Sequence, residues 1–224
     1  MHSHPHLQFG SREEAALQLA KRLSHYSHHP HVIVLAIPKG GVRVGAGIAE
    51  YLQKPFDVLL VGRITVPQCG RASLGAITGG GVRMLNGDLI DRLHLSEREI
   101  REAVLKKSLQ LARRERRYRG TRPSLDLADR TVILADDGTT PCATICNGIR
   151  LLRRQHVERI VVAVPAACEH AACDLRMETD EVVTLSEPHE PTPAGEWFSR
   201  FPPTYESQIR SLLTEGQTGS RPNN

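Results

Sequence analysis

Residues 132–152, VILADDGTTPCATICNGIRLL, contain the pattern that decides the fold. An apolar run is followed by the adjacent carboxylates Asp136 and Asp137, then by a turn rich in glycine and threonine, and then by an amphipathic segment. A buried strand that leads through such a turn into a helix is typical of α/β proteins with a parallel sheet. Ligands of these sheets bind beyond the carboxyl ends of the strands, where we expect the two carboxylates to lie.

Further apolar runs of strand length lie on both sides of this segment. Predicted buried strands are residues 32–37, 56–61, 131–135, 160–164 and 182–185. Helices are predicted from Ser11 to near Pro30, over 42–53 and over about 141–155. Right-handed crossovers would place the five strands in a twisted, mainly parallel sheet with helices on both faces, so the predicted fold class is α/β.

An insertion interrupts the alternation of strands and helices. The glycines and alternating residues of 63–86 favour a hairpin or flap. Ser96 and Glu99 have the spacing of a capping box, which predicts a long helix to about Tyr118. Residues 101–122 contain nine Lys or Arg and two Glu. We interpret most of this charge as a solvated face of a long basic helix.

Composition limits the number of domains and the class of protein. The chain has 224 residues, of which 40% are hydrophobic and 24% charged, with a net charge of +4. We therefore expect one globular domain over 9–213, a flexible His-rich segment at 1–8 and a disordered tail at 214–224. No stretch reaches the roughly 18 apolar residues that a membrane helix needs, and no secretion signal is visible, so we expect a cytoplasmic protein without a membrane partner.

The residues around the acidic pair indicate a ligand of mixed chemistry. Segment 138–144 offers threonine hydroxyls and backbone N–H groups at a helix N-terminus, whose partial positive charge favours a phosphate. Asp136 and Asp137 would repel that phosphate but would bind hydroxyl groups. A sugar phosphate satisfies both requirements.

This order of strand, acidic pair and loop resembles the signature of the type I phosphoribosyltransferases. The similarity covers most of residues 9–213 and extends to a group of predicted phosphoribosyltransferases of uncertain substrate. The matching stretches are AIPKGGVRVGAGIAEYL, FDVLLVGRI, SLGAI, RRERRYRG, RTVILADDG, RIVVAVPAA, DEVVTL and EWFSRF. The resemblance implies a glycosyltransferase that moves a 5-phosphoribosyl group from phosphoribosyl pyrophosphate to an unidentified nitrogenous base or amine.

The resemblance also implies the site. Asp136 and Asp137 would be the catalytic pair that holds the ribose hydroxyls. Residues implied to bind the 5-phosphate are Gly138, Thr139, Thr140, Cys142, Ala143 and Thr144. Residues implied to bind the pyrophosphate are Lys39, Gly40, Gly41 and Arg63, the last expected at the end of the second strand. The cofactor would be Mg²⁺, held mainly by substrate and water rather than by direct protein ligands.

One departure from the family pattern leaves an alternative open. Pro141 and Cys142 stand where family members usually carry Thr-Gly. Because proline has no N–H, one phosphate donor is lost, which favours a catalytically weak nucleotide-binding regulator, with RNA contact through the basic helix as a further option. The opposing interpretation is that Pro141 starts the helix at its first position, where a missing N–H costs little.

Other patterns do not predict a second site. The histidines at 2, 4 and 6 are interpreted as part of a metal-indifferent tail, and the five cysteines lack the spacing of a zinc site. We do not expect a nucleic-acid partner, and a homodimer stays open. The hood that would hold the acceptor has two candidate segments, 65–86 and the residues after Leu185.

Overall fold

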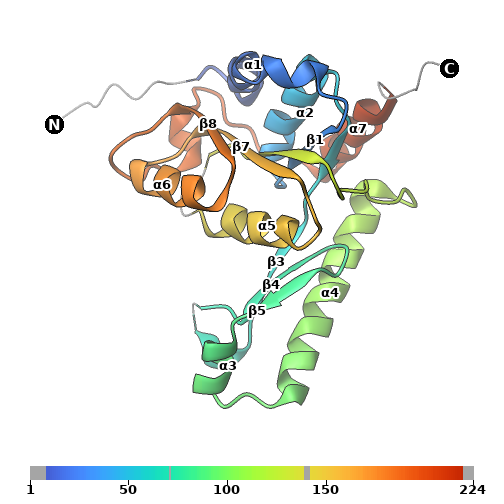
Figure 1. Ribbon diagram of the computed structural model, residues 1–224, viewed down its shortest axis with the longest axis vertical. Helices are drawn as coiled ribbons and strands as arrows, with labels where there is room; N and C mark the ends of the chain where they lie inside the picture. Colours follow the sequence, from blue (N-terminus) through green and yellow to red (C-terminus); the bar gives the residue numbers. More distant parts are fainter. Residues whose placement is uncertain (1–8, 71, 139–141, 219–224) are drawn as a thin grey trace.

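The computed structural model describes residues 9–70, 72–138 and 142–218 (Figure 1). Its centre is a five-stranded parallel sheet in the order β2-β1-β6-β7-β8. The strands are β1 (Val32–Ala36), β2 (Phe56–Val58), β6 (Thr131–Ala135), β7 (Arg159–Ala166) and β8 (Glu181–Ser186). The predicted α/β fold with a mainly parallel sheet is therefore confirmed.

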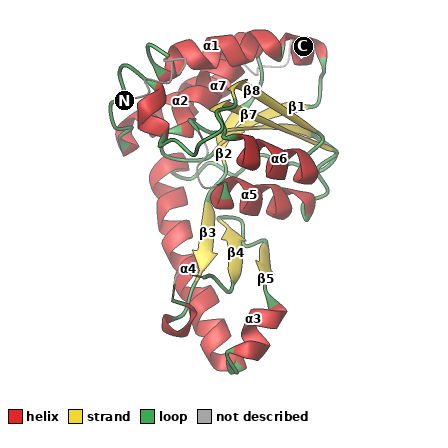
Figure 2. Cartoon of the chain, turned by 90° about the vertical axis from the view of Figure 1, so that its left-hand side faces the viewer, coloured by secondary structure: helices red, strands yellow, loops and turns green. Residues whose placement is uncertain are grey.

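Helices cover both faces of this sheet, as predicted (Figure 2). One face carries α1 (Arg12–Arg22), α2 (Gly41–Leu52) and α7 (Glu206–Thr218), and the other carries α5 (Ala143–Arg153) and α6 (Glu169–Glu178). Successive strand side chains point to opposite faces, so Val34 packs in the first core and Ile33 and Leu35 in the second. Both cores are apolar, which explains the unbroken apolar runs of the sequence.

A second, smaller sheet and a long helix extend away from the parallel sheet (Figures 1 and 2). The antiparallel strands β3 (Val61–Ile64), β4 (Gly75–Thr78) and β5 (Arg83–Leu85) form the sheet, followed by α3 (Gly87–Arg92) and α4 (Glu97–Arg119). The Ser96 hydroxyl accepts the Glu99 N–H, and the Glu99 carboxylate accepts the Ser96 N–H. The predicted hairpin insertion and the predicted capping box are both present. We call β3–β5, α3 and α4 the arm.

The prediction of a single strand over residues 56–61 is wrong. Pairing with β1 ends at Val58, and the chain then enters the antiparallel sheet at Val61. The run FDVLLVGRI is largely apolar, so its periodicity cannot reveal that it serves two sheets. As a consequence, Arg63 lies in β3, opposite Ala76 of β4. It does not lie at the carboxyl end of a strand of the parallel sheet.

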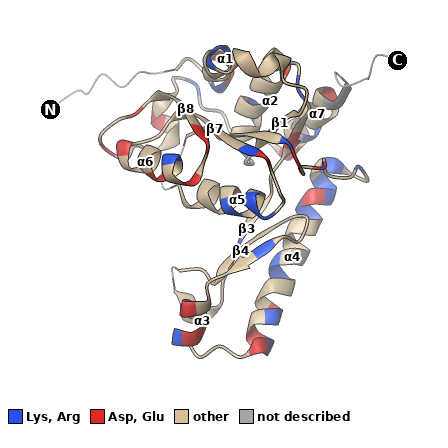
Figure 3. Cartoon of the chain, viewed as in Figure 1, with Lys and Arg blue, Asp and Glu red and all other residues tan. Residues whose placement is uncertain are grey.

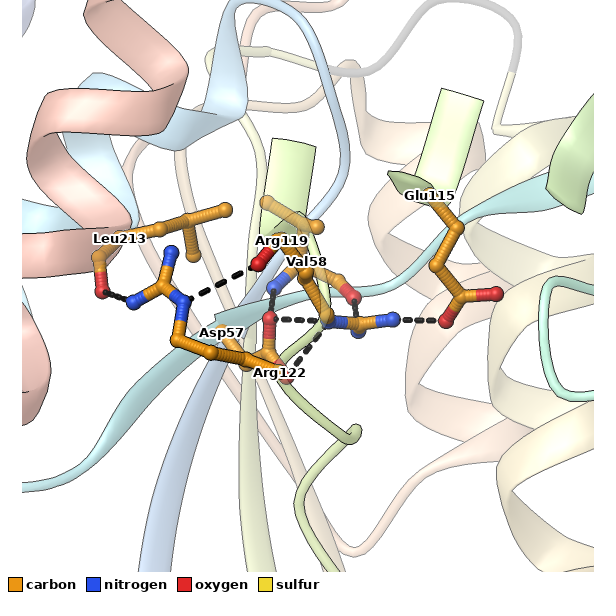
Figure 4. Close-up of polar contacts among 6 residues, drawn as sticks. All are labelled: Asp57, Val58, Glu115, Arg119, Arg122 and Leu213. Carbon is orange, nitrogen blue, oxygen red and sulfur yellow. Dashed lines mark hydrogen bonds and ion pairs between the residues drawn. The ribbon is translucent and has the colours of Figure 1, made fainter. Parts of the chain in front are cut away.

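A buried ionic cluster joins the arm to the edge of the parallel sheet (Figure 4). Arg119 ends α4, and its Nε lies 2.9 and 3.0 Å from the two carboxylate oxygens of Asp57 on β2. Its Nη2 donates to the Val58 carbonyl at 2.8 Å, and its Nη1 contacts Glu115. Asp57 is 1% and Arg119 8% exposed, so this part of the basic charge of α4 is structural.

The remaining basic residues of α4 are distributed along the helix (Figure 3). Arg98 pairs with Glu102 and Arg101 with Glu97, each over one helical turn on the surface. Such exposed pairs contribute little to stability, and they partly neutralise the basic face.

Two further observations concern the ends of the chain and its hydropathy. Helix α7 continues to Thr218, so the expectation of a disordered tail is wrong for residues 214–218. Residues 1–8 and 219–224 lie outside the described part of the chain. Among the helices of the described residues, none combines the length and the apolar character required to span a bilayer.

Candidate functional site

The carboxyl ends of β1 and β6 bring two predicted site segments together. Ala36 and Ala135 are register partners at the ends of these neighbouring parallel strands. The turn Pro38–Gly40 follows β1 and leads into α2 at Gly41, and the segment Asp136–Gly138 follows β6. The segments predicted to bind the pyrophosphate and the sugar therefore lie side by side, at the edge of the sheet where α/β proteins bind ligands.

Direct packing against the acidic pair explains why positions 40 and 41 are glycine. A Cβ on Gly40 would lie 1.8 Å from Asp137 Oδ2, and a Cβ on Gly41 would lie 2.8 Å from Asp136 Cα and 2.9 Å from the Ala135 carbonyl oxygen. No side chain fits at those distances. Sequence reasoning attributed these glycines to close approach of a ligand, and packing against the acidic pair is a second reason for glycine at both positions.

Asp136 is half-buried beside a second acid. Its Oδ1 accepts the backbone N–H of Asp137 at 2.9 Å. Burial of the carboxyl group, and then the neighbouring Asp137 carboxylate, raise the pKa of Asp136 well above its ordinary value. The protonated form of Asp136 is therefore favoured relative to an exposed aspartate.

Asp137 is paired with an arginine from the other end of the chain. Nε of Arg12, in the first turn of α1, donates to Asp137 Oδ2 at 2.8 Å. Nη1 of Arg12 donates to the Pro202 carbonyl at 2.8 Å, and the guanidinium lies 3.6 Å from the centre of the Phe201 ring. With 4% of its surface exposed, Arg12 is a buried cation that links α1, the acidic pair and a late segment of the chain.

We call this late segment, residues 192–203, the strap. A parallel bridge between Phe9 and Phe198 fixes its middle, with hydrogen bonds of 2.7 Å from the Phe9 N–H to the Trp197 carbonyl and 2.8 Å from the Ser199 N–H to the Phe9 carbonyl. Phe9, Trp197 and Phe198 form a small buried apolar cluster at the end of β7. The strap also reaches the acidic segment, because a Cβ on Gly138 would lie 3.2 Å from Ala194 Cβ.

Only part of the predicted 5-phosphate loop is described. Gly138 follows the acidic pair, Cys142 immediately precedes α5, and Ala143 and Thr144 are exposed in the first turn of that helix. The predicted residues Thr139 and Thr140, and Pro141 between them and Cys142, lie outside the described residues.

Cys146, which lies near this loop, is not a reactive nucleophile. Cys142 Sγ lies 3.8 Å from Asp174 Oδ2 on α6. Burial, and then the neighbouring Cys142, raise the pKa of Cys146 to about 12, so its thiol stays protonated at neutral pH. The interpretation of Cys146 from the sequence, as a small buried hydrophobic residue, agrees with this environment.

Sequence reasoning missed Arg12 and the contribution of the strap to the acidic pair. Arg12 lies inside a capping sequence, where it is indistinguishable from any surface arginine of a first helical turn. The strap had a visible signal, since three of the nine aromatic residues fall within EWFSRF. The structure favours the segment after Leu185 over 65–86 as the element that lies against the acidic segment.

Comparisons with known proteins agree with this architecture. No family model matches the chain. Two curated Mycobacterium tuberculosis proteins, from strains CDC 1551 / Oshkosh and ATCC 25618 / H37Rv, are each 33% identical over 205 residues and are named "putative phosphoribosyl transferase". The match covers 92% of this chain and 46% of theirs, so the chain spans about half the length of the curated relatives it matches. The crystal structure of TT1426 from Thermus thermophilus has a TM-score of 0.83 and 28% identity, covering 93% of this chain and 98% of that one.

Fold and site together define an α/β protein with an acidic pair at the carboxyl end of β6, beside the glycine turn that follows the adjacent parallel strand β1. The chain is a homologue of proteins named as phosphoribosyl transferases. These relatives carry a name of the same kind as the family that the sequence pattern resembles.

Proposed function

We propose that the chain binds phosphoribosyl pyrophosphate at this edge of the sheet and transfers its phosphoribosyl group to a nitrogenous base or amine. The observation that carries the proposal is the packing of the Gly40–Gly41 loop directly against Asp136 and Asp137. A ligand that touches the carboxylates through hydroxyls can then reach the loop with a neighbouring group. Ribose 1-pyrophosphate has hydroxyls and pyrophosphate on adjacent carbons, which matches this juxtaposition.

The charge distribution supports a transfer at C1 of the ribose. During transfer the bond from C1 to a pyrophosphate oxygen breaks, and a bond from C1 to the acceptor nitrogen forms. Positive charge develops on the ring and negative charge on the leaving group. Asp136 and Asp137 would hold the hydroxyls and supply negative potential near the ring. Lys39, exposed at the loop, would attract the pyrophosphate together with the amides of Gly40 and Gly41.

The 5-phosphate would bind over Gly138, Cys142, Ala143 and Thr144, together with Thr139 and Thr140. The first turn of α5 supports this assignment, because the positive end of a helix favours anions and Thr144 is exposed there. Arg63 remains a proposed pyrophosphate contact on the strength of the resemblance alone, since its strand belongs to the antiparallel sheet.

The side chains at this site fit Mg²⁺ only as an ion that binds together with the phosphates of the substrate. Within the described residues, no group of three or more His, Cys, Asp or Glu side chains is arranged to hold a metal ion. Asp136 and Asp137 are the hard oxygen donors at the site, and Mg²⁺ commonly binds through one or two carboxylates plus substrate phosphates. When bound, the ion would neutralise charge on the pyrophosphate leaving group.

Pyrophosphate release tests the activity. Phosphoribosyl pyrophosphate and Mg²⁺ are incubated with the protein and with purines, pyrimidines or simple amines, one acceptor at a time, and pyrophosphate is followed by ³¹P NMR. We expect at least one acceptor to accelerate release, and Asp136→Asn with Asp137→Asn to abolish the acceleration. Asp88→Asn with Asp91→Asn is the matched control, because these exposed aspartates lie on α3 of the arm. Acceleration that survives the change at 136 and 137, or no acceleration by any acceptor, contradicts the transferase.

A further inference from the structure

Arg12 makes three contacts that belong to different parts of the fold. Its Nε donates to Asp137 Oδ2, its Nη1 donates to the Pro202 carbonyl, and its guanidinium stacks on Phe201. Phe201 in turn stacks on Phe198 with 5.3 Å between the ring centres. Arg12 therefore ties the last residues of the strap to the acidic pair.

The rest of the strap is held in a different way. Backbone hydrogen bonds connect Ser199 to Phe9 and Arg200 to Gly10, at 2.8 and 3.2 Å. Beyond Arg200, the contacts with Arg12 tie Phe201 and Pro202 down, and Phe201 is 38% exposed. The order of this end of the strap should thus depend on the Arg12 side chain.

The position of Arg12 conflicts with the proposed role of Asp137. The proposed function requires Asp137 to bind a ribose hydroxyl. One of its two carboxylate oxygens, Oδ2, already accepts a hydrogen bond from Arg12. The same oxygen already packs against Gly40, where a Cβ would lie 1.8 Å away. There is little room for a sugar hydroxyl to approach Oδ2 while the guanidinium stays in place.

We propose that Arg12 is a latch: a ribose diol competes with Arg12 for Asp137, and its binding releases the end of the strap beside the site. Arg12 is thus a positioning residue and not a substrate contact, and the inference rests on the proposed function. Because a ligand shifts an equilibrium by its differential affinity for the two states, the closed latch weakens sugar binding and the bound sugar opens the latch.

Hydrogen exchange of the backbone amides of residues 199–201 and 204 measures the latch without requiring activity, since residues 202 and 203 are prolines and have no amide hydrogen. In the absence of ligand, Arg12→Gln should accelerate this exchange about tenfold or more, since one charge-assisted hydrogen bond corresponds to at least that factor. Arg43→Gln is the matched control, because it removes a 2.6 Å ion pair to Glu13, the neighbour of Arg12, without touching the strap or Asp137. Equal acceleration in both variants, or none in Arg12→Gln, overturns the latch.

A ligand experiment on the native protein tests the latch even if Arg12→Gln does not fold. Ribose 5-phosphate should accelerate exchange of residues 199–201 and 204, and 2-deoxyribose 5-phosphate at equal saturation should do so less, because it lacks one hydroxyl of the diol. Where Arg12→Gln folds, it should bind ribose 5-phosphate about tenfold more tightly in a calorimetric titration. Weaker binding would make Arg12 a ligand contact and overturn the latch.

The outcomes separate the two proposals. If neither sugar phosphate binds to any variant, the proposed function fails, while the exchange of ligand-free Arg12→Gln still tests the closed latch. If ribose 5-phosphate binds but leaves the exchange of residues 199–201 and 204 unchanged, the proposed site stands and the latch is overturned.

Discussion

Gly40 and Asp137 approach so closely that a Cβ at position 40 would lie 1.8 Å from Asp137 Oδ2. The two residues come from loops after different strands, and the register of β1 against β6 brings them together. This contact makes the proposed pyrophosphate loop and the proposed ribose carboxylates one packed unit. A substitution in either part should therefore alter ligand binding at the other part.

The first prediction concerns Gly40→Ala. The sequence alone predicts a loss confined to ligands with a pyrophosphate. The contact with Asp137 predicts more, because the new methyl group must displace the carboxylate, so ribose 5-phosphate should also bind at least about tenfold more weakly. Overpacking should lower the free energy of unfolding by about 1–3 kcal/mol. Gly87→Ala is the control, since nothing lies within 4 Å of the Cβ it would add. Calorimetric titrations that show a loss for phosphoribosyl pyrophosphate alone would contradict the packed unit.

The second prediction concerns Asp136 and pH. The folded-state pKa of Asp136 is raised by burial and by Asp137, so folding favours its protonated form. The stability that this form contributes is present below the ordinary aspartate pKa and is lost as pH rises through the raised value. Ionised Asp136 therefore destabilises the fold at neutral pH, and Asp136→Asn should be more stable than the native protein there.

Urea denaturation at several pH values measures this effect. The stability difference between Asp136→Asn and the native protein should be larger at about pH 8 than at about pH 4. A difference that is constant across this range, or one that shrinks as pH rises, would rule out a raised pKa. Asp88→Asn, on an exposed turn of α3, controls for general charge effects.

The third prediction concerns the anchor of the arm. Arg119→Met leaves Asp57 buried without its cation, which should lower the free energy of unfolding by about 3–5 kcal/mol. Adding Asp57→Asn to Arg119→Met should recover part of the loss, because it removes the unpaired charge. Arg98→Met removes an exposed pair and should change stability by no more than about 0.5 kcal/mol. Denaturant titration of the three variants would refute the anchor if Arg119→Met and Arg98→Met behaved alike.

The fourth prediction concerns the departure from the family loop. Pro141→Thr with Cys142→Gly restores an N–H donor and removes the side chain that precedes α5. If the native loop is a weakened phosphate site, affinity for ribose 5-phosphate should rise by about tenfold or more. Calorimetry gives the answer directly, and weaker binding by the double variant would mean that the native loop is already adapted to its ligand.

Much of the fold could be predicted because buried parallel strands have a strong local signal. The run at 131–135 is largely apolar and begins with three β-branched residues, and β6 has those bounds. Capping chemistry likewise fixed the start of α4 at Ser96 and Glu99. By contrast α6, with the sequence EHAACDLRME, was missed, since small and polar residues give it little helical periodicity.

The site could be predicted only where it is local in sequence. Asp136 and Asp137 follow a recognisable strand, so their position at its carboxyl end was expected. The pairing of Arg12 with Asp137 joins distant parts of the chain and depends on how α1 and the strap pack, so no local pattern encodes it. The placement of Arg63 failed for the same reason, because the division of residues 56–64 between two sheets is decided by tertiary packing.

The central claim is that Asp136 and Asp137 hold the ribose of phosphoribosyl pyrophosphate while the Gly40–Gly41 loop holds its pyrophosphate. Calorimetric titration of the native protein with phosphoribosyl pyrophosphate, with and without Mg²⁺, against Asp136→Asn with Asp137→Asn and against the control Asp88→Asn with Asp91→Asn, tests it most directly. We predict binding by the native protein and the control that Mg²⁺ strengthens, and at least about tenfold weaker binding by the variant at 136 and 137. Equal affinity of all three proteins, with Mg²⁺ or without it, would contradict the claim.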